Sequence, residues 1–318
     1  MFWRVVQAFG SSSGMSVGAG AIGDIYKLEE RGTAMGIFFG AALFGPAIAP
    51  LYGGIATHYL SWRMAQWGLF VMGLFAFMPV ALFLPETLDP ERRRRWGATE
   101  EHQKPILLNP FESLALLRSP NILLVALAGT TTLITDFVLM IPLAYTIGKQ
   151  YNITNEALIG AFFLPAGLGN IIGAPLAGRL SDRVVVEWRK RRGGVWVPED
   201  RLRASLWGAG FLVPMSVLLS GLTTQFVPGT PGIVLNLVWL FMNGIGVDIV
   251  LSPAFRAFII AGIIACILPI INTIGVAATG AIFAAFAWFG WGLILFTIKY
   301  GDRMRACVDM GWSTVRDN

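Results

Sequence analysis

Polar side chains inside long apolar runs are the residues of this chain that could do chemistry. Asp136 lies within the run GTTTLITDFVLMIPLAY, with Thr132 one turn before it and Thr135 beside it. A charged carboxylate at the centre of a bilayer costs about 2.5 to 3.5 kcal/mol on insertion scales, so it usually faces a cavity or a partner. Asp136 could therefore carry a proton or balance a cationic ligand. Alternatively, it could act only as a hydrogen-bonding contact between helices.

Other polar residues lie near the ends of apolar runs. Arg4 and Gln7 are about one turn apart in the first run. Arg4 could face the interior or extend outward to the membrane surface, and Gln7 could hydrogen-bond across a helix bundle. In the segment NGIGVDIVLSP, Asn243 could line a cavity or bond a neighbouring helix, and Asp248 is expected to pair with Arg256 across a short turn.

The sequence lacks the residue sets of common enzymes. It has no Ser-His-Asp set, no HExxH pattern and no glycine loop of the kind that cradles phosphate. Its histidines are His58 and His102, both expected in loops. Its cysteines, Cys266 and Cys307, are too few and too differently placed for a disulfide framework or a metal site. We therefore expect no enzyme activity and no bound metal or cofactor.

The elements that position these residues are apolar helices. The chain has 318 residues, of which 55% are hydrophobic and 14% are charged, against about 25% charged residues in soluble domains. This composition predicts an all-α polytopic membrane protein. A helix needs about 20 apolar residues to cross the hydrocarbon layer. Nine such runs are present, at residues 2–22, 33–56, 64–84, 121–147, 155–177, 204–226, 231–251, 256–274 and 277–298.

Lysines and arginines are strongly partitioned between the connections. Because basic loops stay in the cytoplasm, we expect the loops after the first, third and fifth runs and the tail after the ninth on that side. The C-terminus is then cytoplasmic and the N-terminus external, and the net charge of +5 needs no nucleic-acid partner. The basic residues are Lys27, Arg31, Arg92 to Arg95, Lys104, Arg118, Arg179, Arg183, Arg189 to Arg192, Arg201, Arg203, Lys299, Arg303, Arg305 and Arg316.

The longest connection, 85–120, is the expected boundary between two helix bundles. It would be a cytoplasmic loop between a partial N-terminal bundle, 1–84, and a six-helix C-terminal bundle, 121–298, which a cytoplasmic tail, 299–318, follows. Three runs precede the loop and six follow it. A transporter with two six-helix halves would have this pattern if its first three helices were absent. Asn152 begins an NIT acceptor pattern for N-glycosylation, in a loop expected outside.

The segment GAALFGPAIAPLYGG, residues 40–54, combines small residues with two prolines in an apolar run. Small residues allow helix backbones to approach closely in lipid, whereas Pro46 and Pro50 each remove a backbone donor and favour a bend. The segment therefore predicts a bent, close-packed helix, with either a purely structural or a gating role. Its glycines, with one from the preceding turn, are Gly36, Gly40, Gly45, Gly53 and Gly54.

The same segment resembles the fifth-helix motif of drug:proton antiporters in the major facilitator superfamily. The matching residues are Gly45, Pro46, Pro50, Gly53 and Gly54.

Other segments extend the resemblance over nearly the whole chain. RVVQAFG is similar to the fourth-helix motif, with Arg4, Gln7 and Gly10 in matching places, and GDIYKLEERGTAMG is similar to the loop that follows it. GRLSDR, from Gly178 to Arg183, resembles the loop motif between helices eight and nine. KYGDRMRA resembles the C-terminal signature of the fungal twelve-span multidrug branch. The connection through VLSPAFRAFII is shorter than is usual in that family.

The resemblance implies a major facilitator fold with three helices of the N-terminal bundle and six of the C-terminal bundle. It implies proton-coupled export of small apolar or cationic compounds by a monomer in the plasma membrane, with Arg4 in the proton-coupling region. Gly178, Asp182 and Arg183 would form a charge latch at the cytoplasmic gate. The alternatives are a polyamine or sugar transporter, and a truncated fragment that does not transport or acts as a membrane-embedded partner.

Overall fold

The computed structural model describes residues 2–27, 29–85, 87, 118–143, 155–195, 197–246 and 253–307, without the side chains of 253–262, 265 and 305–307. The expected Asp248–Arg256 pair, the Asn152 acceptor, His102 and nearly all of the loop 85–120 lie outside this description. The boundary between bundles therefore stays a prediction.

Every regular element in the described residues is a helix. The helices are α1 (Phe2–Ile25), α2 (Arg31–Tyr59), α3 (Trp62–Phe83), α6 (Pro120–Pro142), α8 (Glu156–Ala161), α9 (Leu164–Arg191), α10 (Asp200–Ala204), the π-helical segment η3 (Gly208–Leu212), α11 (Val213–Phe226), α12 (Thr230–Gly246), α13 (Pro253–Ile274) and α14 (Val276–Cys307). Each predicted apolar run overlaps one, two or three consecutive helical segments.

Six helical segments in the described residues are long and apolar enough to cross a membrane. They are 31–59, 62–83, 120–142, 156–191, 208–226 and 276–304, and the apolar helix Thr230–Gly246 is shorter. The chain is therefore a multi-pass, all-helical membrane protein as predicted. The count of nine crossings stays a prediction.

The second helix is longer than its apolar run. α2 continues through Pro46 and Pro50 to Tyr59, so His58 lies in its last turn and not in the loop where we expected it. The loop is short because Ser61 already caps α3, with its Oγ accepting a hydrogen bond from Met64 N.

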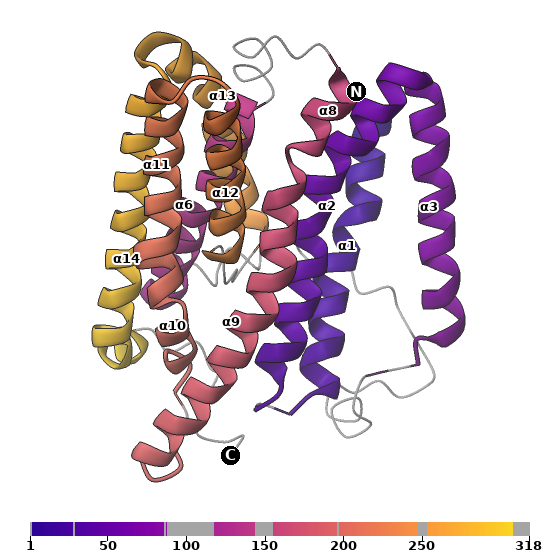
Figure 1. Ribbon diagram of the computed structural model, residues 1–318. Helices are drawn as coiled ribbons and strands as arrows, with labels where there is room; N and C mark the ends of the chain where they lie inside the picture. Colours follow the sequence, from indigo (N-terminus) through magenta and orange to yellow (C-terminus); the bar gives the residue numbers. More distant parts are fainter. Residues whose placement is uncertain are drawn as a thin grey trace.

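The helices form two groups that meet along α2 and α9. Figure 1 shows these two helices side by side at the centre, with α1 and α3 on one side and α6, α11, α12, α13 and α14 on the other. We call α1 to α3 the N-terminal group and α6 to α14 the C-terminal bundle. The main apolar core belongs almost entirely to that bundle and includes the buried side chains of Leu133, Val138, Val217, Leu240 and Phe283. α1 and α3 contain no buried residue.

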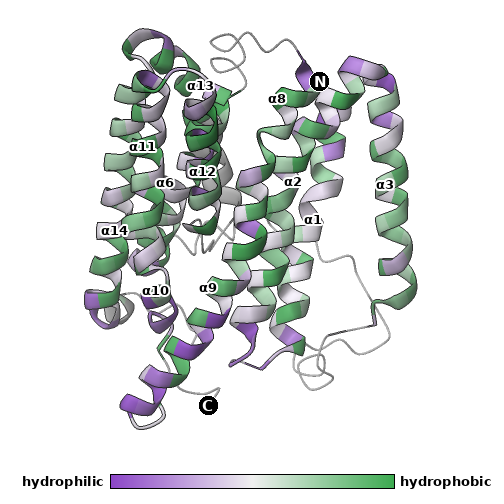
Figure 2. Cartoon of the chain, in the orientation of Figure 1, coloured by the Kyte–Doolittle hydropathy of each residue, from purple (hydrophilic) through white to green (hydrophobic). Residues whose placement is uncertain are grey.

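Polar residues gather at one end of the molecule, where α9 extends beyond its neighbours and α10 follows (Figure 2). We call this the basic end. The connection between α1 and α2, the end of α9 and α10 meet there, because Arg189 pairs with Glu29 and Arg201 with Asp182. α9 stops at Gly193 and Gly194, whose φ angles of 69° and 101° suit glycine.

Candidate functional site

Helices α2 and α9 approach each other at the level of their backbones. A methyl group on Gly36 would overlap the carbonyl oxygen of Ala174, and one on Gly178 would overlap the carbonyl oxygen of Gly32. A methyl on Gly54 would overlap the carbonyl oxygen of Glu156 at the start of α8. These glycines therefore permit close helix packing, as small residues generally do in membranes.

The predicted close-packed face of α2 includes Gly36, Gly40 and Gly54, but it does not include Gly45 and Gly53. No described atom lies within 4 Å of a methyl position on either of these two. The reason is helix geometry at about 3.6 residues per turn. Gly54 follows Gly36 by five whole turns and shares its face, whereas Gly45 is half a turn out of phase.

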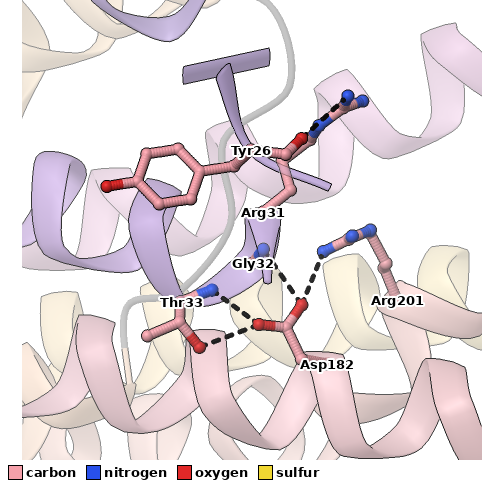
Figure 3. A network of polar contacts seen from close by, with 6 residues as sticks. All are labelled: Tyr26, Arg31, Gly32, Thr33, Asp182 and Arg201. Carbon is pink, nitrogen blue, oxygen red and sulfur yellow. Dashed lines mark hydrogen bonds and ion pairs between the residues drawn. The ribbon is translucent and has the colours of Figure 1, made fainter. Parts of the chain in front are cut away.

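Asp182 of α9 caps the N-terminus of α2 from across the interface. Its Oδ1 accepts a hydrogen bond from Gly32 N at 3.0 Å, and its Oδ2 accepts from Thr33 N and Thr33 Oγ1, each at 2.8 Å (Figure 3). The first N–H groups of a helix have no partner inside the helix and carry partial positive charge, so they suit a carboxylate. Glu30, at the N-cap position, makes no side-chain capping bond, so Asp182 supplies that cap.

Arg201 of α10 completes this contact. Its NH1 lies 3.4 Å from Asp182 Oδ1, and Asp182 is only 8% exposed. Burial lowers the pKa of Arg201, the charge of Asp182 opposes that shift, and the charge of Arg31 adds to it. Arg31 itself donates to the carbonyl oxygen of Gly23 at 2.6 Å. We call Gly32, Thr33, Asp182 and Arg201 the latch.

The latch differs from the expected one in its cation. Arg183 is exposed and lines an open cleft of about 450 Å³ together with Tyr26, Glu30 and Arg179. Asp182 lines the same cleft, and among these residues of α9 it is Asp182 that hydrogen-bonds to α2. Sequence analysis placed Arg201 only among the basic loop residues. A buried carboxylate calls for a cation, but it does not indicate which of several nearby arginines supplies it.

Arg4 and Gln7 contact each other near the start of α1. Arg4 NH1 donates to Gln7 Oε1 at 3.3 Å, and both residues are exposed. In the described residues neither one faces a helix-bundle interior, so the implied place of Arg4 in a coupling region stays a prediction.

Asp136 and Asn243 both lie inside the C-terminal bundle. Asp136 is 7% exposed on α6, next to Thr135, which is fully buried. Asn243 Nδ2 donates to Ser216 Oγ at 2.8 Å and to Thr135 Oγ1 at 3.4 Å. Of the two roles left open for Asn243, the structure shows the bond to neighbouring helices.

Sequence analysis missed further buried polar groups. Asn236 of α12 accepts a hydrogen bond from Ser220 and donates to Thr224 on α11. Asn170 of α9 is 2% exposed, and its Oδ1 has no hydrogen-bond partner among the described residues. Their only signal is an asparagine inside an apolar run, which does not specify a partner. Among the described residues, no group of His, Cys, Asp and Glu could hold a metal ion.

The sequence matches the model of one protein family. The model of the Major Facilitator Superfamily matches residues 1–263. The MFS transporter OpS2 of Beauveria bassiana is 26% identical over 283 residues, which cover 79% of this chain and 79% of OpS2. Citrate exporter 1 of Aspergillus niger is 46% identical over 90 residues, or 28% of this chain and 17% of the exporter. MFS antiporter QDR3 of Candida albicans is 42% identical over 85 residues, or 27% and 12% of the two chains.

The matches differ in how much of each relative they span. They span most of OpS2 but less than a fifth of the citrate exporter and of QDR3. No solved structure matches the chain significantly. The relatives are membrane transporters of small molecules, which points to a transporter and not to an enzyme. Since the family model matches most of the chain, the chain belongs to the Major Facilitator Superfamily.

Proposed function

We propose that the chain exports small apolar or cationic molecules in exchange for protons, as part of an alternating-access transporter in the plasma membrane. The latch is the observation that carries this proposal. It joins the N-terminal group to the C-terminal bundle through one buried carboxylate at the basic end. Such a contact has a functional effect only if it forms in one conformation and breaks in another.

We assign the basic end to the cytoplasm, because basic connections stay on that side of a membrane. The described conformation is then closed toward the cytoplasm, with the latch as its inner gate. Opening the gate would separate the N-terminus of α2 from Asp182 and leave the first N–H groups of α2 to water.

Asp136 is our candidate for the proton-coupling acid. Its carboxyl is buried on α6, beside Thr135, and a buried carboxylate in a membrane helix is costly enough to mark functional positions. In this proposal Asp136 takes up a proton from the external side and releases that proton into the cytoplasm, while substrate moves in the opposite direction.

The N-terminal group has open faces among the described residues. α1 and α3 bury no residue, and Gly10 and Gly14 of α1 have no described atom within 4 Å of a methyl position. Lipid or further membrane helices, as in a six-helix half, would cover these faces. The same open faces favour a second candidate function, a membrane-embedded partner that does not transport by itself.

The experiment is proton-gradient-driven efflux of a fluorescent cationic dye from vesicles that contain this 318-residue chain. Asp136→Asn is compared with wild type, and Glu187→Gln is the matched control, because Glu187 is an exposed carboxylate that pairs with Arg191. We expect efflux in wild type and the control, and none with Asp136→Asn. No efflux from correctly inserted wild type would reject transport by this chain alone. Equal efflux with Asp136→Asn would reject Asp136 as the coupling acid.

A further inference from the structure

The short helix α10 contacts three separate parts of the structure through three consecutive residues. These are Glu199, Asp200 and Arg201, and the first two are 7% and 0% exposed. A buried carboxylate is costly unless it is paired or hydrogen-bonded. The partners of Glu199 and Asp200 therefore determine where α10 can lie.

Asp200 holds α10 against the end of α9. Its Oδ2 lies 2.6 Å from Arg192 NH1, and its Oδ1 lies 3.6 Å from Arg203 Nε. The guanidinium of Arg203 in turn stacks over the Trp188 ring at 3.9 Å. Removing one partner of a buried ion pair leaves the other charge uncompensated. These contacts therefore hold α10 against the end of α9.

Glu199 holds α10 against the ends of two other helices. Asn121 Nδ2, in the first turn of α6, donates to Glu199 Oε1 at 3.1 Å and to the carbonyl oxygen of Gly301 in α14, also at 3.1 Å. A methyl group on Gly301 would come within 2.5 Å of Glu199 Oε1. Glu199 thus fits between α6 and α14 at the basic end, and its carboxyl lies directly against Gly301.

Arg201 is the third contact and belongs to the latch. It follows Glu199, the N-cap residue of α10, by two residues, and its NH1 reaches Asp182 Oδ1 at 3.4 Å (Figure 3). A shift of α6 relative to α14 would move Glu199. Because α10 is only five residues long, that movement passes directly to Arg201.

We propose that Glu199 and Asn121 are positioning residues for the latch: they couple its closure to the arrangement of α6 and α14 at the base of the C-terminal bundle. The proposal rests on the proposed function, because it treats the latch as a gate. α10 is then the part through which a rearrangement inside the C-terminal bundle reaches the contact with the N-terminal group.

The test measures the distance between the α1–α2 connection and the end of α9, at the basic end of the full chain in lipid nanodiscs. Spin labels are placed by Lys27→Cys and Lys190→Cys, two exposed positions, after Cys266→Ser and Cys307→Ser. Double electron–electron resonance gives the distribution of distances between the two labels, and from it the ratio of separated to close conformations. Glu199→Ala removes the hydrogen-bond acceptor, Asn121→Ala removes the donor, and Glu199→Gln keeps an amide oxygen that can accept the same bond.

We expect Glu199→Ala and Asn121→Ala each to raise the ratio about fivefold, which corresponds to the loss of about 1 kcal/mol for one hydrogen bond. Glu199→Gln should change it less than about twofold by the same reasoning. In an Asp182→Ala background, Glu199→Ala should add little, because the contact that it positions is already lost.

An unchanged ratio in both alanine variants would overturn the proposal, and so would a full additional increase in the Asp182→Ala background. If Asp182→Ala alone leaves the ratio unchanged, the latch does not hold the helices together and the proposal fails with it. Absence of dye efflux while all these ratios behave as expected would reject the proposed transport and leave the coupling through α10 intact.

Discussion

Glycines on the two sides of α2 have opposite surroundings. In the contact between α2 and α9, Gly36 and Gly178 face backbone oxygens that a single methyl group would overlap. In α1, no described atom lies within 4 Å of a methyl position on Gly10 or Gly14. A run of small residues therefore indicates that a helix can be approached closely, but only the packed structure shows whether another helix does so.

The same contrast extends to large side chains. In the C-terminal bundle, Leu240 and Val217 are 2% and 1% exposed, whereas Phe9 of α1 and Phe83 of α3 are 84% and 80% exposed. Exposed apolar surface on this scale needs lipid or further helices to cover it. The C-terminal bundle thus buries its large apolar side chains within the described residues, whereas α1 and α3 leave theirs exposed.

The largest effect is expected from adding a methyl group at Gly178, where the helices are packed. The same addition at Gly14, which has open surroundings, is the counterpart. Gly178→Ala forces a methyl into the backbone of α2 and should lower the free energy of unfolding by about 2 to 3 kcal/mol. Gly14→Ala meets nothing and should be neutral or stabilise by up to about 1 kcal/mol, because alanine favours helix over glycine. Detergent-induced unfolding of the purified chain measures both. Comparable destabilisation by Gly14→Ala would show that α1 is already packed.

Removal of the latch carboxylate should have the next largest effect. Asp182→Ala leaves two N–H groups of α2 without their cap and removes the ion pair with Arg201, so we expect a loss of about 2 kcal/mol of stability. Arg183→Ala, on the adjacent but exposed position, should change stability by less than about 0.5 kcal/mol. The same unfolding measurement applies. Equal effects of the two variants would contradict the assignment of Asp182 to the latch.

Replacing Arg201, the cation of the latch, should have a smaller and pH-dependent effect on stability. Burial lowers the pKa of Arg201, but arginine starts from a value above about 12 and stays charged. Lysine starts near about 10.4, and the same burial would lower its pKa toward a range where it can be titrated.

Arg201→Lys should therefore be less stable than wild type near neutral pH and should regain about 1 kcal/mol of stability as pH rises through the lowered pKa, because the unfolded chain then binds more protons than the folded one. The direction follows because a pKa that is lower in the folded chain than in the unfolded chain means that folding favours the neutral lysine. Unfolding measured from pH 7 to pH 10 tests this, with wild type as the control. Parallel curves for the two proteins would be inconsistent with a lowered pKa at this position.

The smallest effect is expected at the exposed pair in α1. Gln7→Ala removes the acceptor of Arg4, yet exposed contacts of this kind contribute less than about 0.5 kcal/mol. Asn243→Ala, which removes a buried link between α12, α6 and α11, should cost about 1 to 2 kcal/mol. A large loss with Gln7→Ala would show that this end of α1 has partners beyond the described contacts.

Sequence analysis placed Asp182 and Arg183 in one predicted gate, and that role stays a prediction. In the structure Asp182 pairs with Arg201, which the sequence did not single out, whereas Arg183 is exposed. The difference has a simple cause. Asp182 lies in a recognisable motif, whereas the choice among neighbouring arginines depends on how α9 and α10 are oriented. The same applies to α2, where Gly54 packs and Gly53 does not, although the two are adjacent in the sequence.

By itself the sequence determined the membrane helices and the clustering of basic residues at one end, because hydropathy and charge are properties of each local segment. The tertiary structure alone decided which helix faces meet, that Asp182 caps a helix 150 residues earlier in the chain, and that α10 joins three elements. Those outcomes depend on the rotation and approach of helices that are distant in sequence. Local composition does not encode such pairwise geometry.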